Sequence, residues 1–488
     1  MPYRLIDGKI EPLFFSADEI MEKLRKDRIN FLDLQFTGLT GRFHHTTMAS
    51  KMLHKEDFED GLPKLDGSSI RGFTEIHESD LILKPDPSTY ATIPWIEKDS
   101  TARLICDIMT GGPETNRYPR DPRGIAFNAV KYVQKMGYES SFWGPEVEFF
   151  VFDKLEVNTM TPYQGQSYKI TSREAPWSAE GVAYSLRLKE GYLPGAPSDT
   201  LMDYRNECVD VLGNHFGIIC DTHHHEVATA GQCEIDIRYD TLVNAADSVQ
   251  TYKYIVKNIA KKYNMVATMM PKPIALDNGS GMHVNVSLWD KQKNLFFDER
   301  DNYAEMSETA RYFGGGIIEH ANALAAIVAP TTNSYRRLVP GYEAPVYVAW
   351  SKGNRSAIIR IPAHYKGSKF APMKRIEFRA PDPSCNPYFA FSAIIAAGMD
   401  GIIKKKPLGD AIDEDIFKMS PHRRRELGVK QLPASLRDAY EALNCDRIFL
   451  KQIFGDDVID SIIENELREF NEVAVRPHPH EFSMYADV

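Results

Sequence analysis

The chain has 488 residues, of which 43% are hydrophobic and 26% charged, and its formal net charge at pH 7 is −10. This length favours two or more domains with ample core, and the negative charge argues against nucleic-acid partners, whose phosphates require a basic face. No apolar run approaches the roughly 20 residues that span a bilayer, and the six cysteines form no CxxC pair. We therefore expect a cytoplasmic protein with reduced thiols and no membrane partner.

The first part of the chain predicts a small domain. Residues 17–28 have the pattern of a short helix, and residues 29–36 and 102–108 have the pattern of strands. The polar, Gly- and Pro-rich segment 111–124 follows and is typical of a domain boundary. We therefore expect an N-terminal domain over residues 1–115 and a catalytic domain over residues 116–488.

The longer second part predicts helices that alternate with strands. The helices are expected at residues 125–137, 248–263, 308–328 and 387–403. Asn386 can cap the last of these, and Pro387 suits its first helical position. Residues 158–197 are polar and lack periodicity, so they are expected to form a long insertion. The fold class is therefore α+β or α/β.

Four stretches of this second part have the pattern of strands with polar chemistry on one face: Glu146 to Phe152, Glu234 to Tyr239, His283 to Leu288 and Arg375 to Phe378. Successive side chains of a strand point to opposite faces. Glu146 and Glu148 therefore share the face opposite Val147. The same alternation joins Glu234 to Asp236 on one strand and His283 to Asn285 on another. Together the four strands predict a sheet curled around a polar cavity, which is the candidate active site.

Six potential metal ligands come from these strands and their flanks: Glu146, Glu148, Glu226, Glu234, His283 and Glu377. Carboxylates with a lone imidazole suit Mg²⁺ or Mn²⁺ better than a structural zinc. Each acid alone would more often be a salt-bridge partner, but several on inward faces indicate a metal site. The run His223 to His225 would send its side chains to both faces, so a structural role and a role beside the metal are equal alternatives.

Five arginines in the C-terminal half lie beside Gly or Pro turns: Arg337, Arg355, Arg360, Arg375 and Arg379. Guanidinium groups bind carboxylate and phosphate bidentately, so these residues favour an anionic, phosphorylated reactant such as ATP. One or two of them are expected to neutralise the buried carboxylates instead. Pro340 to Pro345 has the composition of a mobile loop that carries Glu343. Gly314 to Gly316 lacks the Lys and Ser/Thr of a phosphate loop, which favours close packing or a helix start.

Seven ordered runs of the chain carry a family resemblance: Leu65 to Ile70, Gly144 to Phe150, His224 to Gln232, Asn278 to His283, Asn333 to Pro345, Asn354 to Ala357 and Arg375 to Arg379. In these runs the chain resembles type I glutamine synthetases over nearly its whole length. The resemblance implies an α+β fold with a small N-terminal β-grasp domain. It further implies a catalytic domain with a curved antiparallel sheet surrounded by helices, in a dodecamer of two hexameric rings with active sites between subunits.

The same resemblance implies the reaction and its participants. ATP-dependent ligation of ammonia to the γ-carboxylate of L-glutamate would proceed through γ-glutamyl phosphate and give L-glutamine, ADP and phosphate. Glu148, Glu226 and Glu234 would hold the metal that orients glutamate. Glu146, His283 and Glu377 would hold the metal on the ATP phosphates. At least two Mg²⁺ or Mn²⁺ ions per active site would then be required.

The remaining roles also come from the resemblance. Glutamate would be bound by Asn278, Gly279, Arg337 and Arg379. ATP or the transferred phosphoryl group would contact Ser287, Arg355, Arg360 and Arg375. Asp66 of a neighbouring subunit would attract ammonium and take its proton, and Glu343 would close over the site. Asp66, Glu343 and Arg355 are thus the expected catalytic residues.

The chain departs from the family pattern at three positions. Asn285 stands where many members have a second histidine. Phe417, which has no hydroxyl, stands where one subtype has a tyrosine that is modified by adenylylation. Glu75 stands near the position of the other subtype's feedback arginine. Neither control device is therefore expected.

Three other functions are alternatives to this one. A glutamate–polyamine ligase would keep the metals and arginines but need a less ionic amine pocket, and Asp66 and Glu343 argue against it. A non-catalytic relative should have lost metal ligands, and all six are present. Without the resemblance, a metal-assisted hydrolase is the best interpretation, although the clustered arginines favour phosphoryl transfer.

Overall fold

The structure, a computed structural model, describes residues 3–6, 9–12, 15–74, 79–96, 98–111, 115–178, 184–363 and 365–488. Glu75 lies outside the described residues. Within them, no helix has both the length and the apolar character that crossing a membrane requires.

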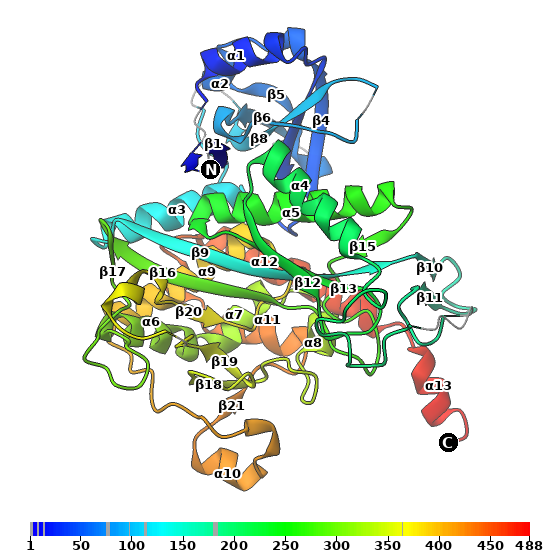
Figure 1. The fold of residues 1–488 in the computed structure, drawn as a ribbon, viewed down its shortest axis with the longest axis vertical. Coiled ribbons are helices and arrows are strands. Elements are labelled where there is room, and N and C mark those ends of the chain that lie inside the picture. The colour runs from blue at the N-terminus through cyan, green and yellow to red at the C-terminus, as the bar shows by residue number, and fades with distance from the viewer. Residues whose placement is uncertain are drawn as a thin grey trace.

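The N-terminal part is a mixed sheet with short helices, at the top of Figure 1. Its sheet has the order β4-β3-β8-β6-β5, with β7 on β8, and β3 is parallel to β8. A separate hairpin, β1 and β2, precedes it. Ser16 and Glu19 form a capping box that starts the first helix. The elements are β1 (Tyr3–Ile6), β2 (Lys9–Pro12), α1 (Ala17–Lys26), β3 (Phe31–Thr37), β4 (Phe43–Ala49), η1 (Ser50–Met52), α2 (Asp57–Asp60), β5 (Leu62–Asp66), η2 (Gly67–Ser69), β6 (Asp80–Pro85), η4 (Pro87–Thr89), β7 (Ala91–Thr92) and β8 (Thr101–Thr110).

The second part is built on a large sheet with the order β12-β13-β9-β16-β20-β19-β18-β21. All neighbours in it are antiparallel except β18 and β19. The short strands β14 and β15 pair with β9, and β17 pairs with β16. The strands are β9 (Ser140–Phe152), β12 (Cys220–His225), β13 (Gln232–Ile237), β14 (Asp240–Thr241), β15 (Val266–Thr268), β16 (Met282–Asp290), β17 (Lys293–Asn294), β18 (Tyr347–Ser351), β19 (Ala357–Arg360), β20 (Ile376–Phe378) and β21 (Lys430–Gln431).

Helices cover this sheet, and α5 and α9 pack against each other, with α5 on β9. Nearly every residue of α9 is buried, which fits its almost uniformly apolar sequence. The helices are α3 (Pro122–Lys135), α4 (Met202–Phe216), α5 (Leu242–Lys262), α6 (Glu308–Glu319), α7 (Ala321–Val328), α8 (Ser334–Arg337), η5 (Ser368–Met373), α9 (Pro387–Ile403), η6 (Ile416–Lys418), α10 (Pro421–Glu426), α11 (Leu436–Cys445), η7 (Ile448–Leu450), α12 (Asp456–Ala474) and α13 (Pro479–Tyr485).

The prediction of one helix over residues 308–328 is wrong, because the chain breaks at His320 between α6 and α7. The His320 ring bonds to Asp400 at 3.0 Å and to Asp446 at 2.7 Å. It also stacks on Phe449 with ring centroids 4.0 Å apart. These partners come from distant parts of the chain, so the local apolar pattern could not reveal the break.

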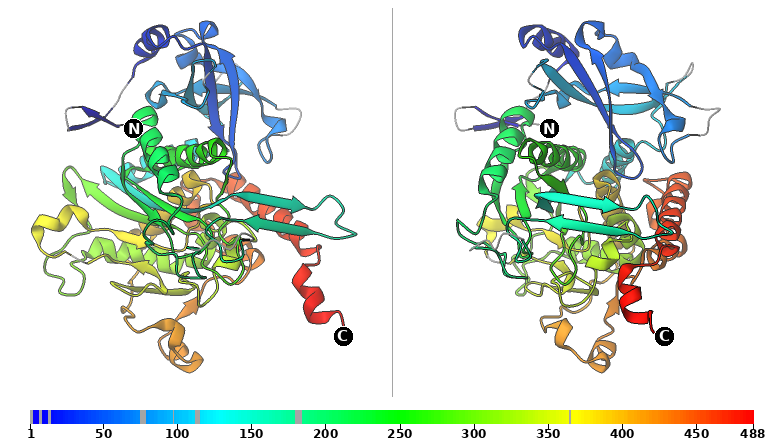
Figure 2. Two further views of the ribbon diagram at one scale, coloured as in Figure 1. Left: turned by 45° about the vertical axis from the view of Figure 1, so that its right-hand side comes forward. Right: turned by 90° about the vertical axis from the view of Figure 1, so that its right-hand side faces the viewer.

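The segment of residues 158–197, predicted as a long insertion, contains regular structure that its sequence does not reveal. Residues 167–171 form a strand, β11 (Ser167–Thr171), which pairs with β10 (Lys154–Asn158) in an antiparallel hairpin. Figure 2 shows this hairpin and the C-terminal helix α13 projecting from the body of the molecule. Many of the hairpin's side chains are exposed, so it carries little of the apolar alternation that marks a strand in sequence.

The close-packing interpretation of Gly314 to Gly316 is confirmed. These glycines lie in α6, where it crosses α9. A Cβ atom built at Gly316 would lie 2.0 Å from the Ala397 carbonyl oxygen, and one at Gly315 would lie 2.2 Å from the Lys406 carbonyl oxygen. Gly316 therefore meets the backbone of α9, Gly315 meets the backbone just after α9, and only glycine fits at these two positions.

Candidate active site

Strand register brings the polar faces of β9, β13 and β16 together. Glu148 on β9 faces Glu234 on β13, and Glu146 on β9 faces both Asp236 on β13 and His283 on β16. Residues that face each other in an antiparallel pair point to the same side of the sheet. The opposite side carries Val147, which is fully buried. The alternation of polar and apolar residues along these strands therefore separates a polar side of the sheet from an apolar, buried side.

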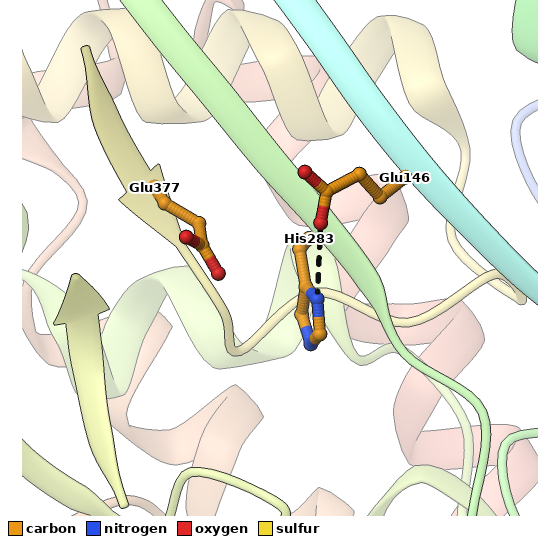
Figure 3. Close-up of side chains that lie close together, drawn as sticks. All are labelled: Glu146, His283 and Glu377. Carbon is orange, nitrogen blue, oxygen red and sulfur yellow. Dashed lines mark ion pairs between the residues drawn. The ribbon is translucent and has the colours of Figure 1, made fainter. Parts of the chain in front are cut away.

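One cluster of candidate metal ligands is formed by Glu146, His283 and Glu377 (Figure 3). Their ligand atoms all lie within 4.8 Å of one another. The Glu146 carboxylate approaches the His283 ring at 3.5 Å, and Glu377 points toward the same space from β20. Burial, reinforced by Arg379, holds the pKa of His283 well below its usual value. The ring is therefore neutral, which is the form that binds a metal.

A second cluster is formed by His224, Glu226 and Glu234, again with ligand atoms within 4.8 Å of one another. The two nitrogens of His224 lie 3.6 Å from Glu226 and 3.6 Å from Glu234. His224 shares the inward face because it pairs with Glu234 across β12 and β13. Its neighbours point elsewhere, since His223 bonds to Asn206 and His225 to Glu174. The expected scattering of this histidine run is confirmed.

Glu148, which the sequence grouped with Glu226 and Glu234, lines the same pocket. One of its oxygens accepts hydrogen bonds from the Gly281 backbone at 2.9 Å and from Gln232 at 3.0 Å. Burial and the neighbouring Glu226 raise the pKa of Glu148 to about 8. Burial and Glu148 likewise raise the pKa of Glu234 well above its usual value. A divalent cation would offset this repulsion, so the donor set fits a hard metal ion.

The arginines surround these carboxylates. Arg337, Arg355, Arg360 and Arg379 line the pocket. Glu377 accepts hydrogen bonds from Arg379 at 2.5 Å and from Arg360 at 3.0 Å. Arg337 donates to the backbone carbonyls of residues 379–381 and so fixes the chain after β20. At least part of this positive charge therefore neutralises Glu377 and supports the site's own backbone.

A second cleft adjoins the first and shares Glu146 and Asp236 with it. Ser287 and Arg375 lie in this cleft, beside the aromatic rings of Phe142, Tyr239 and Trp289. Asn285 connects the two regions, because it donates to Glu146 at 2.9 Å and accepts from Arg375 at 2.8 Å. One side chain thus contacts both regions.

The loop before β16 and the loop before β18 close one side of the pocket. Asn278 donates to Glu343 at 3.5 Å, and both line the pocket with Gly279. A Cβ atom at Gly281 would lie 2.5 Å from an Arg337 nitrogen and 3.1 Å from the His283 ring. Glycine at this position therefore lets the arginine and the histidine approach the same backbone.

Asp66 is the last residue of β5 in the N-terminal sheet, and it does not line the pocket of its own chain. Its side chain is exposed, and hydrogen bonds from Ser68 and Ser69 lower its pKa. The carboxylate is therefore ionised and open to solvent or to another subunit. Its role at a neighbouring active site stays a prediction.

Several pocket residues were not identified from the sequence. The pattern of the histidine run gives His224 two alternative roles, and strand alternation places Asp236 on the inward face without indicating its role. Strand pairing decides both positions. Tyr192 and Tyr342 also line the pocket. Tyr192 belongs to an irregular stretch with no periodicity to mark it, and the Tyr342 ring shows no role until its neighbours in space are known.

Both parts of the chain match known family models. Residues 28–111 match the family described as "Glutamine synthetase, beta-Grasp domain" and residues 119–485 match "Glutamine synthetase, catalytic domain". The expected β-grasp domain and helix-covered catalytic sheet are thereby confirmed.

Relatives and solved structures agree with this match. A glutamine synthetase of Sulfolobus acidocaldarius is 52% identical, over 96% of this chain and 98% of its own. One of Aquifex aeolicus is 44% identical, over 97% of this chain and 99% of its own. A cryo-EM structure of Plasmodium falciparum glutamine synthetase superposes with a TM-score of 0.86 at 28% identity, covering 97% of this chain and 99% of its own.

Proposed function

Because this chain belongs to the glutamine synthetase family, we propose that it joins ammonia to the γ-carboxylate of L-glutamate at the expense of ATP. The reaction gives L-glutamine, ADP and phosphate through γ-glutamyl phosphate. The observation that carries the proposal is the pair of ligand clusters on one sheet, flanked by arginines in one pocket. A carboxylate oxygen is a poor leaving group, and phosphorylation of glutamate removes this obstacle.

The two clusters are proposed to hold two divalent cations, Mg²⁺ or Mn²⁺. Glu146, His283 and Glu377 would hold one, and Glu226 and Glu234 would hold the other, with Glu148 and with His224 at their side. Bound there, the cations would offset the negative charge of the ATP phosphates and of the glutamate γ-carboxylate. Arg355 and Arg360 supply further positive charge in the same pocket, where charge builds on the transferred phosphoryl group.

The substrates are assigned by the chemistry of the two adjoining clefts. ATP is proposed to place its base among Phe142, Tyr239 and Trp289, with Ser287 and Arg375 beside it, because aromatic walls suit a purine ring. Glutamate is proposed to lie against Asn278, Gly279, Arg337 and Arg379. The phosphates would then meet the glutamate γ-carboxylate near Glu146 and Asp236, the two residues common to both clefts.

The ammonium end of the reaction is proposed to need two subunits. Glu343 lies at the pocket, whereas Asp66 is exposed in the N-terminal sheet. An ionised carboxylate supplied by a neighbour would attract ammonium and accept its proton, which leaves nucleophilic ammonia. A dodecamer of two hexameric rings, with active sites between subunits, would provide this arrangement. We place the domain boundary at residues 115–116 and the protein in the cytoplasm, where its six free cysteines would stay reduced.

The function is tested by measuring glutamine and ADP with ATP, Mg²⁺ or Mn²⁺, and glutamate, first with ammonium and then with a polyamine. Glutamine should form with ammonium, and ADP release should require both glutamate and ammonium for full rate. Omitting the divalent cation should stop the reaction. Robust product with the polyamine and none with ammonium would identify an amine ligase on the same fold.

The shared site predicts complementation between two inactive variants. Asp66→Ala and Glu377→Ala oligomers should each be nearly inactive. Subunits dissociated, mixed and reassembled should regain up to about a quarter of the native activity, because in a random mixture that fraction of interfaces pairs an intact Asp66 with an intact Glu377. The activity is read as glutamine formed, and mixing is verified by mass spectrometry of differently labelled subunits. Verified hybrids without recovered activity would show that Asp66 does not act across the interface.

A further inference from the structure

Two lysines from distant parts of the sequence lie over one aromatic ring beside the pocket. The Lys189 ammonium is 4.2 Å from the centre of the Tyr342 ring, and the Lys272 ammonium is 3.8 Å from it. Burial lowers the pKa of Lys272 to about 8, so this group is still mostly cationic at pH 7. A cation over the face of an aromatic ring is attracted by the negative charge on that face.

The loop that carries Tyr342 is held in a costly backbone conformation. Gly341 has φ +93° and Glu343 has φ +58°, and the second of these is rare for a residue with a side chain. Such backbone persists only when surrounding contacts hold it. Lys189 supplies one further contact, since its ammonium donates to the Gly341 carbonyl at 3.4 Å. The two lysines therefore contact the loop at and beside the residues that have positive φ.

Asp277 fixes both lysines relative to the pocket. Its side chain is fully buried and accepts hydrogen bonds from the backbone of Lys189 at 3.1 Å, of Asn278 at 2.9 Å and of Thr229 at 2.8 Å. The Lys272 ammonium donates to the Asp277 backbone carbonyl. One carboxylate thus joins the segment that carries Lys189 to the loop that presents Asn278 to Glu343.

We infer that Lys189 and Lys272 form a clasp on the Tyr342 ring that keeps the 340–345 loop closed and Glu343 at the pocket. This inference rests on the proposed function, because the closed loop matters only if a water-sensitive intermediate is made beneath it. Tyr342 and Lys189 are positioning residues, since their role is exerted through Glu343. Through Lys189, the irregular segment of residues 184–197 would thus help to hold the loop that carries Glu343.

The consequence of an open loop follows from the chemistry of the intermediate. Water that attacks γ-glutamyl phosphate breaks the acyl–phosphate bond, regenerates glutamate and releases phosphate. The sum is ATP plus water giving ADP and phosphate, with no glutamine formed. The clasp should therefore control how many ADP molecules are released per glutamine, particularly when ammonium is scarce.

The test uses full-length oligomers of Tyr342→Leu, which removes the ring, Tyr342→Phe, which keeps it, and Lys189→Met, which removes one cation. Lys189→Met leaves the backbone bond to Asp277 intact. Hydrogen exchange is followed by mass spectrometry over residues 339–345, and ADP and glutamine are counted at limiting ammonium. Lys23→Met is the matched control, because Lys23 lies 5.3 Å from the Tyr90 ring in the N-terminal domain.

Tyr342→Leu and Lys189→Met should speed exchange of the loop by about threefold or more and raise the ADP-to-glutamine ratio by a similar factor. Tyr342→Phe should preserve slow exchange and a low ratio, and Lys23→Met should change neither. Native exchange and a native ratio in Tyr342→Leu would overturn the clasp. If the native protein makes no glutamine, the proposed function is wrong, and this result does not depend on the clasp. The exchange data still decide the clasp, because faster loop exchange in Tyr342→Leu and Lys189→Met supports it and unchanged exchange refutes it.

Discussion

Replacement of Glu377 by alanine is expected to reduce glutamine formation by at least about 1000-fold, which corresponds to about 4 kcal/mol of lost transition-state stabilisation. Glu377 is 2% exposed and belongs to the ligand cluster with Glu146 and His283. It also accepts hydrogen bonds from Arg360 and Arg379. The substitution would therefore remove a proposed metal donor and leave two arginines without this carboxylate.

The measurement is kcat for glutamine, together with Mn²⁺ titration of the purified variant. Binding of Mn²⁺ should weaken even without substrates, which separates a ligand role from a role in the chemistry alone. Glu156→Ala is the control, because Glu156 is an exposed glutamate on the β10–β11 hairpin that pairs with Lys154. Circular dichroism would show that both variants fold. A kcat within tenfold of the native value in a folded Glu377→Ala protein would exclude Glu377 from the metal site.

The second large effect is expected on stability. Gly316→Ala should lower the free energy of unfolding by about 3 kcal/mol or more, the upper range for overpacking a filled core. The added Cβ would lie 2.0 Å from the Ala397 carbonyl oxygen and 2.8 Å from the Gly401 nitrogen, so the backbones of α6 and α9 must separate. Because α9 is buried on nearly all sides, it cannot move without disturbing the rest of the core.

Gly213→Ala is the matched control for this prediction. Gly213 lies in α4, and a Cβ atom there would meet nothing within 4 Å. Alanine is favoured over glycine within a helix by about 1 kcal/mol, so this variant should be slightly more stable than the native chain. Thermal or urea unfolding of the three proteins measures both effects. Equal stability of Gly316→Ala and the native protein would contradict the tight crossing of α6 and α9.

Local sequence patterns predicted the structure correctly where the pattern was strong and depended only on neighbouring residues. Helix α9 begins at Pro387 and ends at Ile403, as predicted, because Asn386 caps it and an apolar run fills it. The inward-facing acids were found for a similar reason. Alternation along β9 is a property of neighbouring residues, so it is visible before the partners of the strand are known.

Features that depend on distant partners could not be predicted in this way. The break at His320 depends on Asp400 and Asp446, which lie 80 and 126 residues further along the chain. The place of His224 in the cluster with Glu226 and Glu234 depends on which residue of β13 it faces. A single sequence gives the face of each side chain, whereas the partners that complete a cluster come from the tertiary fold.

The alternation of polar and apolar side chains along β9 restricts how this strand can change over evolutionary time. Point substitutions alter one face of the strand at a time. Insertion or deletion of a single residue within it would move Val147 and its apolar neighbours into the pocket and the glutamates into the core at one stroke. Strands of this kind should thus keep their length even as their composition drifts. Additions and losses of residues should gather in projecting segments such as the β10–β11 hairpin, where no face has to be preserved.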